Sequence, residues 1–152
     1  MFRLEGQSPV YLIDTNVISE MRNKRRANAG VLDFFRQANL AGARLYLSAI
    51  TVGEMRRGVE LVRRRGDISY ARSLGAWLDA VLDDFADSVL SFDLECAQVW
   101  GRLRANEPGH ELDKQIAAVA VVNDLTVVTR NTADFARTGV VITNPFAAED
   151  QR

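Results

Sequence analysis

Four acidic residues stand where one expected secondary-structure element gives way to the next. Asp14 and Glu54 each follow an apolar run, Asp113 heads an apolar helical segment, and Asp134 follows a β-branched run. In an open parallel sheet the carboxyl ends of the strands meet at one crevice, so we expect these side chains to converge there. Carboxylates held together repel one another unless a cation lies between them, and oxygen ligands suit Mg²⁺ or Mn²⁺. The sequence therefore predicts a hard-metal site.

Length and composition restrict the class of protein. The 152 residues are 47% hydrophobic with 3 prolines, which is typical of one packed globular domain. Because the chain has one cysteine, Cys96, and one histidine, His110, an internal disulfide, a Cys/His zinc cage and a two-histidine acid–base pair are excluded. The longest apolar run, 116–122, is too short to cross a bilayer, and residues 1–5 lack the apolar core of a signal peptide. We therefore expect a cytoplasmic protein with no membrane partner.

The hydrophobic pattern alternates between strand-like and helical segments. The clearest amphipathic helix is 69–86, whose apolar residues recur at helical spacing. The alternation predicts an α/β fold with a parallel sheet, in one domain over residues 8–148 with frayed termini at 1–7 and 149–152. The expected strands are 10–13, 45–48, 89–92, 126–129 and 140–142, and the other expected helices are 16–22, 29–40, 51–65, 93–108 (capped by Asp93) and 116–122, the last of which should be buried on all sides.

Each acidic residue also has a purely structural interpretation. Asp14 and Asp113 stand where they could cap the helices that follow, and Asp134 could form a turn. Glu54 lies three residues after Thr51, which is the spacing of a capping box. Because four coincident structural roles are less expected than one shared site, the metal site is the favoured hypothesis.

The net charge of −1 hides an asymmetry along the chain. Residues 1–66 hold 12 Lys or Arg against 6 Asp or Glu, whereas residues 67–152 hold 7 against 14. Arginine clusters beside an acidic metal site favour a polyanion such as RNA, held through its phosphates. The alternative is that the arginines form a solvated helix face. The residues predicted to contact RNA are Arg56, Arg57, Arg63, Arg64 and Arg65.

Five blocks of the sequence follow one another in a characteristic order. They are LIDTNVISE (12–20), LSAITVGE (47–54), DKQIAA (113–118), TRNTADF (129–135) and NPF (144–146). In order and spacing these blocks resemble the PIN-domain ribonucleases of the VapC toxin type. A single block is weak support for this resemblance, but five in the family order over residues 10–146 are strong support.

The resemblance implies a single PIN-like α/β domain with a five-stranded parallel sheet flanked by helices. It also implies a Mg²⁺- or Mn²⁺-dependent endoribonuclease that is the toxin of a type II toxin–antitoxin pair, forms a homodimer and binds a cognate antitoxin. The family's catalytic acids fall on Asp14, Glu54, Asp113 and Asp134. Asp14 and Asp113 are then the expected metal ligands, Asp134 serves a second ion or its water, and Glu54 completes the acidic cluster or orients the attacking water.

Polar neighbours are expected to support these acids. Thr15 and Asn16 should hold Asp14 by hydrogen bonds, as groups around metal ligands commonly do. The polar residue that follows the fourth strand in the family falls on Thr129, with Asn131 close behind it.

The sequence departs from the family pattern directly after the third acid. Small or apolar residues are commoner at the position of Lys114, where a lysine could pair with a carboxylate and lower the metal affinity. We expect Lys114 to point to solvent instead. The segment before Asp113 also looks short, and we expect His110 in it to be a simple loop residue.

Two other functions stay open at this point. A phosphoryl-transfer domain would use Asp14 as phosphoacceptor, although Asn16 stands where one such fold wants a second Asp. A non-catalytic PIN-like module would only bind RNA or a partner protein. For an antitoxin, we expect a groove formed by the apolar helix faces around Phe34, Phe35 and 74–85, from which an antitoxin arginine could reach the acids.

Overall fold

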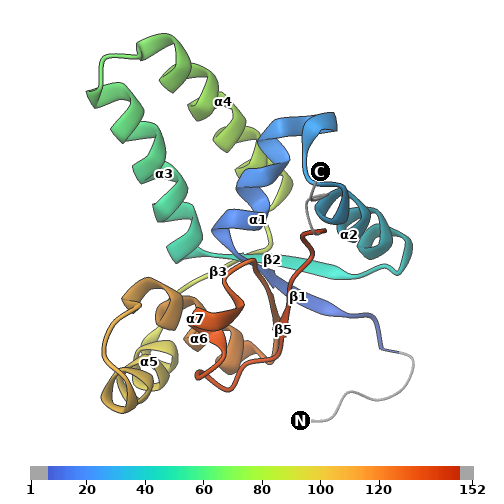
Figure 1. The fold of residues 1–152 in the computed structure, drawn as a ribbon. Helices are drawn as coiled ribbons and strands as arrows, with labels where there is room; N and C mark the ends of the chain where they lie inside the picture. The colour runs from blue at the N-terminus through green and yellow to red at the C-terminus, as the bar shows by residue number, and fades with distance from the viewer. Residues whose placement is uncertain (1–6, 148–152) are drawn as a thin grey trace, which may run out of the picture.

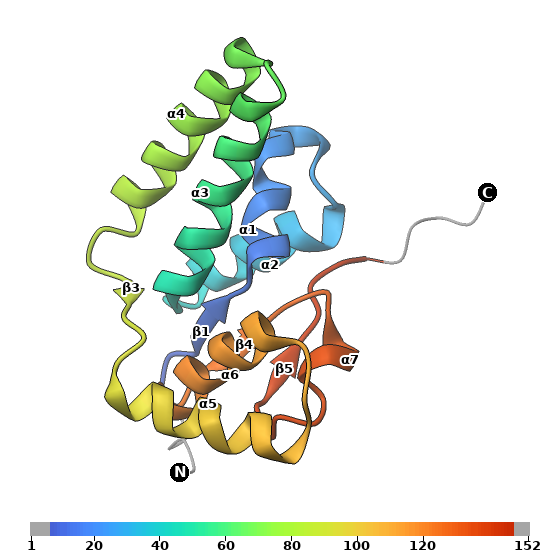
Figure 2. The same cartoon turned by 90° about the vertical axis from the view of Figure 1, so that its left-hand side faces the viewer.

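The computed structural model describes residues 7–147, which form five parallel strands flanked by helices (Figure 1 and Figure 2). This confirms the predicted fold class. Apart from Gln7, the termini that we expected to fray lie outside the described residues. The strands are β1 (Val10–Ile13), β2 (Arg44–Ser48), β3 (Val89–Leu90), β4 (Thr126–Val128) and β5 (Ile142–Thr143), and the helices are α1 (Thr15–Glu20), the 3-10 helix η1 (Met21–Arg26), α2 (Ala29–Leu40), α3 (Ala49–Arg64), α4 (Ile68–Asp84), α5 (Leu94–Asn106), α6 (Glu111–Asn123) and α7 (Thr132–Phe135).

Strand β1 lies at the centre of the sheet, whose strand order is β3-β2-β1-β4-β5. Leu12 pairs with Tyr46 of β2 on one side and with Val127 of β4 on the other. The chain therefore moves outward from β1 through β2 to β3 and then returns to the opposite side of β1. Ligands of open α/β sheets bind at the carboxyl ends of the strands where the order reverses in this way. The fold thus forms its crevice directly after β1 and β4.

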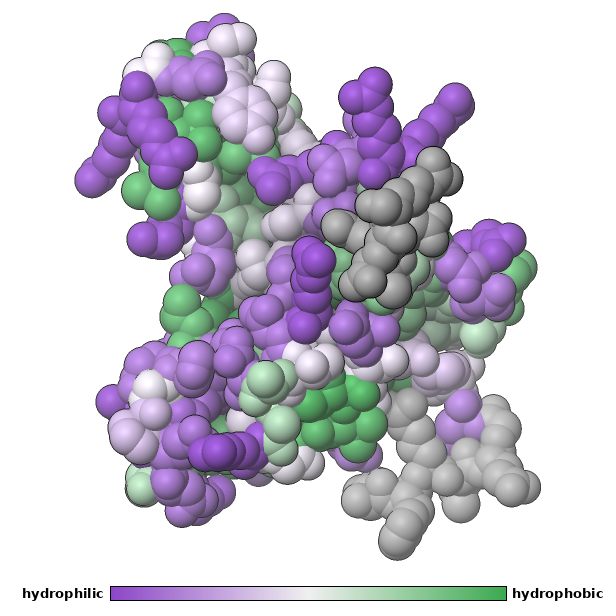
Figure 3. Space-filling view, viewed as in Figure 1, coloured by the Kyte–Doolittle hydropathy of each residue, from purple (hydrophilic) through white to green (hydrophobic). Residues whose placement is uncertain are grey.

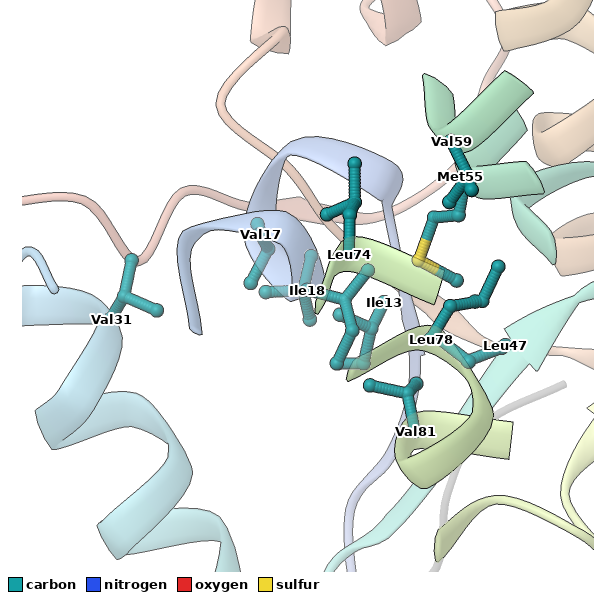
Figure 4. Packing of buried hydrophobic residues seen from close by; sticks show 11 residues of the cluster. Ile13, Val17, Ile18, Val31, Leu47, Met55, Val59, Leu74, Leu78 and Val81 are labelled. Atoms are coloured by element: carbon teal, nitrogen blue, oxygen red, sulfur yellow. The ribbon is translucent and has the colours of Figure 1, made fainter. Parts of the chain in front are cut away.

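Each face of the sheet has its own hydrophobic core because successive strand residues point to opposite faces. Ile13 and Val128 pack with α1, α3 and α4 in one core, which Figure 4 shows around Leu78. Leu12 and Val127 pack in the other core beneath α5 and α6. All four strand residues are fully buried. The crevice after β1 and β4 is therefore held by rigid elements on both sides.

Helices α3 and α4 pack against each other and project beyond the sheet as an arm (Figure 1 and Figure 2). A hollow separates this α3–α4 arm from the lobe that contains α5, α6 and α7 (Figure 3). Within residues 7–147, no helix has both the length and the apolar character needed to cross a membrane.

Several element boundaries differ from the predictions. The helix expected over 16–22 gives way after Glu20 to η1, inside which Lys24 has a φ of +51°. The helix expected at 116–122 begins earlier, at Glu111, because Gly109 and His110 both adopt positive φ and end the preceding loop there. That helix is also not buried on all sides, since Val121 is 44% exposed. By contrast, Asp93 caps α5 as predicted, accepting the N–H of Cys96 at 2.9 Å.

The segment after β5 crosses the start of α2. The side chain of Asn28 accepts the backbone N–H of Gly30 and of Ala147, both at 2.9 Å, and donates to the carbonyl of Ala147 at 3.2 Å. A Cβ atom on Gly30 would lie 2.2 Å from the carbonyl oxygen of Pro145. The absence of a side chain at Gly30 is therefore what allows the two segments to touch.

Candidate active site

Asp14 is the most deeply placed of the four acids. It follows the last residue of β1 and is 3% exposed. Its Oδ1 accepts the backbone N–H of Thr15 at 2.7 Å, and its Oδ2 accepts the hydroxyl of Thr129 at 2.7 Å and the amide of Asn16 at 3.3 Å. The carboxylate of Asp14 caps α1 and also faces the crevice, so its helix-capping role does not exclude a role as metal ligand.

A short network fixes the groups that hold Asp14. Thr129 is fully buried after β4, and its hydroxyl also accepts the backbone N–H of Asn131 at 3.0 Å. The side-chain oxygen of Asn16 accepts the backbone N–H of Arg130 at 3.1 Å. Burial raises the pKa of Asp14, although the hydrogen bonds that its carboxylate accepts from Thr129, Thr15 and Asn16 lower it. The carboxylate is thus oriented by donors that do not cancel its charge.

Three of the four predicted acids line one pocket. Asp14, Glu54 and Asp113 come from β1, α3 and α6 and surround a space of about 290 Å³, together with Asn131 and the apolar side chain of Leu112. Among the described residues, no Lys, Arg or His forms an ion pair with any of the three. We call this space the acid pocket.

Asp113 carries the largest electrostatic perturbation in the acid pocket. Burial and repulsion by Asp14, Asp134 and Glu54 raise its pKa to about 6, and nearby His110 partly offsets this rise. A carboxyl whose pKa approaches neutrality because it is buried and lies among other carboxylates marks a site that a cation would stabilise. The N-cap role considered for Asp113 is wrong, because His110 occupies the cap position and Asp113 lies in the first turn of α6.

Asp134 lies in α7, next to Asp113 but on the far side from the acid pocket. Its Oδ1 is 3.6 Å from Nδ1 of His110. Ligand atoms of His110, Asp113 and Asp134 all lie within 4.8 Å of one another, so these three side chains could share a metal ion. His110 was expected to be a simple loop residue. Its place three residues before Asp113 was the signal that could have identified it.

Two further expectations about this region are wrong. Lys114 does not point to solvent: its side chain is buried, at 4% exposure, and its ammonium donates to the carbonyl of Gly109. Glu54 is not part of a capping box with Thr51, because Ser48 caps α3 by accepting the N–H of Thr51 at 3.0 Å. Glu54 therefore has no part in capping α3.

The five arginines predicted to contact RNA lie on and just after α3 and are all exposed. Arg56 pairs with Asp79 of α4 at 3.4 Å, and Arg63 pairs with Glu60 at 2.5 Å. Both pairs are exposed, so each contributes little to stability. These arginines form a charged face of the α3–α4 arm.

The donor set of the acid pocket fits a hard divalent ion. It consists of carboxylates and amide or hydroxyl oxygens, with no sulfur, and imidazole enters only at its edge through His110. Mg²⁺ and Mn²⁺ prefer such oxygen ligands. A phosphoacceptor role for Asp14 fits less well, because Asn16, which donates to Asp14, stands where one such fold wants a second Asp.

Comparison with known proteins decides the family. A profile of the PIN domain matches residues 11–141. The chain belongs to the PIN-domain family. It is similar to the plasmid stability protein StbB of Pseudomonas syringae pv. tomato, with 42% identity over 90% of this chain and 99% of the relative. It is also similar to the VapC ribonuclease Y4jK of Sinorhizobium fredii, with 36% identity over 89% of this chain and 96% of the relative.

A third relative and a similar solved structure both come from Neisseria gonorrhoeae. The toxin FitB of Neisseria gonorrhoeae is 35% identical over 89% of this chain and 97% of the relative. The crystal structure of FitAcB from the same organism matches with a TM-score of 0.76 and 34% identity, covering 89% of this chain and 97% of that chain. The family predicted from the five sequence blocks is therefore confirmed.

Proposed function

We propose that this PIN-domain protein is a Mg²⁺-dependent endoribonuclease, able to use Mn²⁺, and the toxin of a type II toxin–antitoxin pair. The observation that carries the proposal is the meeting of Asp14, Glu54 and Asp113 in one pocket without a cation partner, with the pKa of Asp113 raised to about 6. A divalent ion would relieve this repulsion. The names of two relatives support the proposal: one is a VapC ribonuclease, which supports the activity, and the other is the toxin FitB, which supports the toxin role.

Each acid has a distinct role in the proposed reaction. Asp14 and Asp113 would hold the ion, which would supply polarisation of the phosphoryl group and a more nucleophilic water. Glu54, half-buried on α3 across the pocket, accepts a hydrogen bond from the attacking water and orients it toward phosphorus. Asp134 contributes from α7, where it adds negative charge beside Asp113 and, together with His110, could hold a second ion.

The neutral donors around Asp14 keep the ligand in place before the substrate arrives. Thr129 and Asn16 fix one carboxylate oxygen, and the N–H of Thr15 fixes the other. An ionised carboxylate has about four acceptor positions, so these three contacts leave room for an ion. This arrangement lowers the cost of organising the site at the moment of reaction.

The antitoxin is proposed to bind beside the α3–α4 arm. A groove of about 150 Å³ between α1, α3 and α4 has apolar walls that include Val59, Leu74 and Trp77, and Glu54 lies at one end. Phe34 and Phe35, which we expected to form this groove, instead pack against the core below α2. An antitoxin arginine that followed the groove to Glu54 could take the place of the metal ion among the acids.

The activity is tested with purified protein and a single-stranded RNA that reports cleavage by fluorescence. Wild type should cleave with Mg²⁺ or Mn²⁺ and stop in EDTA, and Asp14→Asn should abolish cleavage while the far-UV circular dichroism spectrum is retained. Asp79→Asn, an exposed carboxylate of the α3–α4 arm, is the matched control and should retain activity. Cleavage that persists in EDTA, or in Asp14→Asn, would contradict the proposal.

The partner is tested by co-expression with the product of the neighbouring gene. Analytical ultracentrifugation of the toxin alone should show a dimer, and the co-expressed sample a larger complex without nuclease activity. A fully active monomer that ignores the neighbouring gene product would remove the toxin–antitoxin part of the proposal and leave the nuclease part standing.

A further inference from the structure

A second cavity opens next to the acid pocket. It has a volume of about 390 Å³ and lies between the end of α5, the start of α6 and the region of α7, so we call it the α5–α7 cavity. This volume is within the range of about 300–1,000 Å³ found for ligand sites. His110 and Asp134 line it and also lie within reach of Asp113. A polymer bound at the acid pocket would therefore pass this cavity.

Lys114 is the unusual residue of the cavity wall. Its side chain is 4% exposed, and its ammonium donates to the carbonyl oxygen of Gly109. Over residues 7–147, no carboxylate lies within ion-pair distance of this ammonium. The other two basic side chains of the cavity have acidic partners: Arg137 lies 3.1 Å from Glu107, and His110 lies 3.6 Å from Asp134.

A buried positive charge without a counter-charge is costly. Removing an ammonium from water is unfavourable unless an opposite charge or several hydrogen bonds compensate for it, and one carbonyl is a partial compensation. An anion that enters the cavity would supply the missing charge. Lys114 has three N–H donors, so it can keep its bond to Gly109 and still donate to a phosphate oxygen.

We propose that the α5–α7 cavity binds a phosphate group of the RNA strand adjacent to the scissile phosphate, with Lys114 as its principal contact. The inference rests on the proposed nuclease function, because that function places a polyanion at the neighbouring acid pocket. Lys114 is then a substrate-positioning residue: it does not touch the reacting phosphorus, and it sets the register of the strand past Asp134.

The test compares Lys114→Gln with Lys24→Gln, which removes the other lysine of the chain from an exposed position in η1. Binding of a single-stranded oligoribonucleotide is measured over a range of salt concentrations in EDTA, which removes the metal ion that the proposed cleavage needs. Lys114→Gln should weaken binding roughly five- to tenfold and reduce the slope of log K against log salt by about one. Lys24→Gln should change affinity less than about twofold.

Cleavage kinetics provide a second readout. Lys114→Gln should raise KM by a similar factor and leave kcat within about threefold of wild type, because a positioning contact acts mainly on binding. Lys114→Met serves as the variant that preserves packing. It should retain or raise the melting temperature, since it removes an uncompensated buried charge, and it should show the same binding loss.

The outcomes separate the possible failures. If wild type does not cleave RNA but Lys114→Gln still lowers affinity and salt slope, the cavity proposal holds as an RNA contact while the nuclease proposal fails. If wild type cleaves and the Lys114 variants keep wild-type KM and salt slope, the cavity proposal is overturned alone. If inorganic phosphate raises the melting temperature of wild type but not of Lys114→Gln, and RNA affinity is equal in both, the cavity binds free phosphate and the RNA proposal is wrong.

Discussion

The acid pocket and the α5–α7 cavity lie side by side at the same edge of the sheet, but their charges are arranged in opposite ways. In the acid pocket, Asp14, Glu54 and Asp113 face one another with neutral donors as their partners. In the cavity, Glu107 pairs with Arg137 and Asp134 lies beside His110, whereas the Lys114 ammonium has the carbonyl oxygen of Gly109 as its partner and no carboxylate of residues 7–147 within ion-pair distance.

In the functions proposed above, the two neighbouring spaces divide the recognition of one phosphodiester strand. The carboxylates of the acid pocket suit a metal cation, and the Lys114 ammonium, which has no carboxylate partner, suits the phosphate next along the strand. Asp134 and His110 line the cavity and also lie close to Asp113 of the acid pocket, so they form the boundary between the two. The two regions can therefore be separated by experiments that change one charge at a time.

The largest effect is expected in the acid pocket. Asp113→Asn should lower kcat by at least about 10²- to 10³-fold, as the loss of a direct ligand or charge-stabilising group does. It should also stabilise the metal-free protein by about 1–2 kcal/mol at pH 7.5, allowing for solvent screening, because it removes a carboxylate that its neighbours repel. Cleavage rates and thermal unfolding with EDTA measure the two effects.

The matched variants for this experiment are Asp134→Asn on the boundary and the exposed Asp83→Asn on α4. Asp134→Asn should reduce activity by a smaller factor, and Asp83→Asn should change neither activity nor stability appreciably. Equal losses of activity for Asp113→Asn and Asp134→Asn would show that the acid pocket and the α5–α7 cavity act as one site.

Loss of the hydrogen bond from Thr129 that orients Asp14 is expected to have the next largest effect. Thr129→Val keeps the shape of the side chain but removes the hydroxyl that donates to Asp14 and accepts the N–H of Asn131. A loss of about 10- to 100-fold in metal affinity or activity is typical for a partner of a metal ligand. Thr129→Ser should restore most of it. Activity of Thr129→Val equal to wild type at limiting Mg²⁺ would show that the orientation of Asp14 is not limiting.

The pH dependence should follow Asp113. Its pKa of about 6 in the folded protein lies above the ordinary value of 3.8, so the folded state holds a proton between about pH 4 and 6 that the unfolded state has released. The contribution of Asp113 to the stability of the metal-free protein is therefore lost as the pH rises through 6. Because a protonated carboxyl is a poor ligand, activity at limiting Mg²⁺ should fall about tenfold per unit below pH 6.

Two measurements check this prediction. Urea unfolding of wild type and Asp113→Asn between pH 4 and 8 should give curves that converge at low pH. Raising the Mg²⁺ concentration should move the acidic fall in activity to lower pH. If the midpoint of the acidic fall in activity does not depend on the Mg²⁺ concentration, the fall is caused by a group other than Asp113.

The arginines of the α3–α4 arm should have a smaller and less specific effect. Replacing Arg56 and Arg57, or Arg63, Arg64 and Arg65, by Glu should weaken binding of unrelated RNAs by similar factors and flatten the salt dependence. Filter binding in EDTA at several salt concentrations measures this. If the slope is unchanged, these arginines are a solvated face or an antitoxin contact, and RNA recognition is confined to the two spaces at the sheet edge.

A substitution outside both regions should leave activity per folded molecule unchanged. Gly30→Ala introduces a Cβ atom 2.2 Å from the carbonyl oxygen of Pro145, so it should destabilise the fold by roughly 1–3 kcal/mol. Gly101→Ala in α5 is the control, because its new Cβ atom would meet nothing within 4 Å apart from its chain neighbours and the backbone of its own helix, and it should stabilise by up to about 1 kcal/mol. Equal melting temperatures for the two variants would contradict the close contact.

Local sequence rules were sufficient to predict the site residues whose positions are fixed by the sheet. The apolar run before Asp14 predicted β1, and the parallel sheet that follows from alternating elements predicted that carboxylates from distant segments would meet. The family resemblance added Thr129 as a polar residue that supports the acids, and in the structure it donates a 2.7 Å hydrogen bond to Asp14.

Positions that depend on loop conformation could not be predicted in this way. Lys114 was expected in solvent because lysine usually is, whereas the positive φ angles of Gly109 and His110 turn the loop so that a carbonyl faces the ammonium. The same turn brings His110 beside Asp134. The capping box considered for Glu54 is wrong for a different reason: α3 begins at Ala49, so Ser48 caps it by accepting the N–H of Thr51.

The hydrogen bond between Asp14 and Thr129 spans 115 positions of the chain. During synthesis from the amino terminus, β1 leaves the ribosome long before its partner β4 does. Asp14 can therefore reach its working orientation only after nearly the whole domain has been translated and β4 has paired with β1. A ribosome that makes this protein is consequently not exposed to an assembled acidic site on the nascent chain until translation of the domain is almost complete.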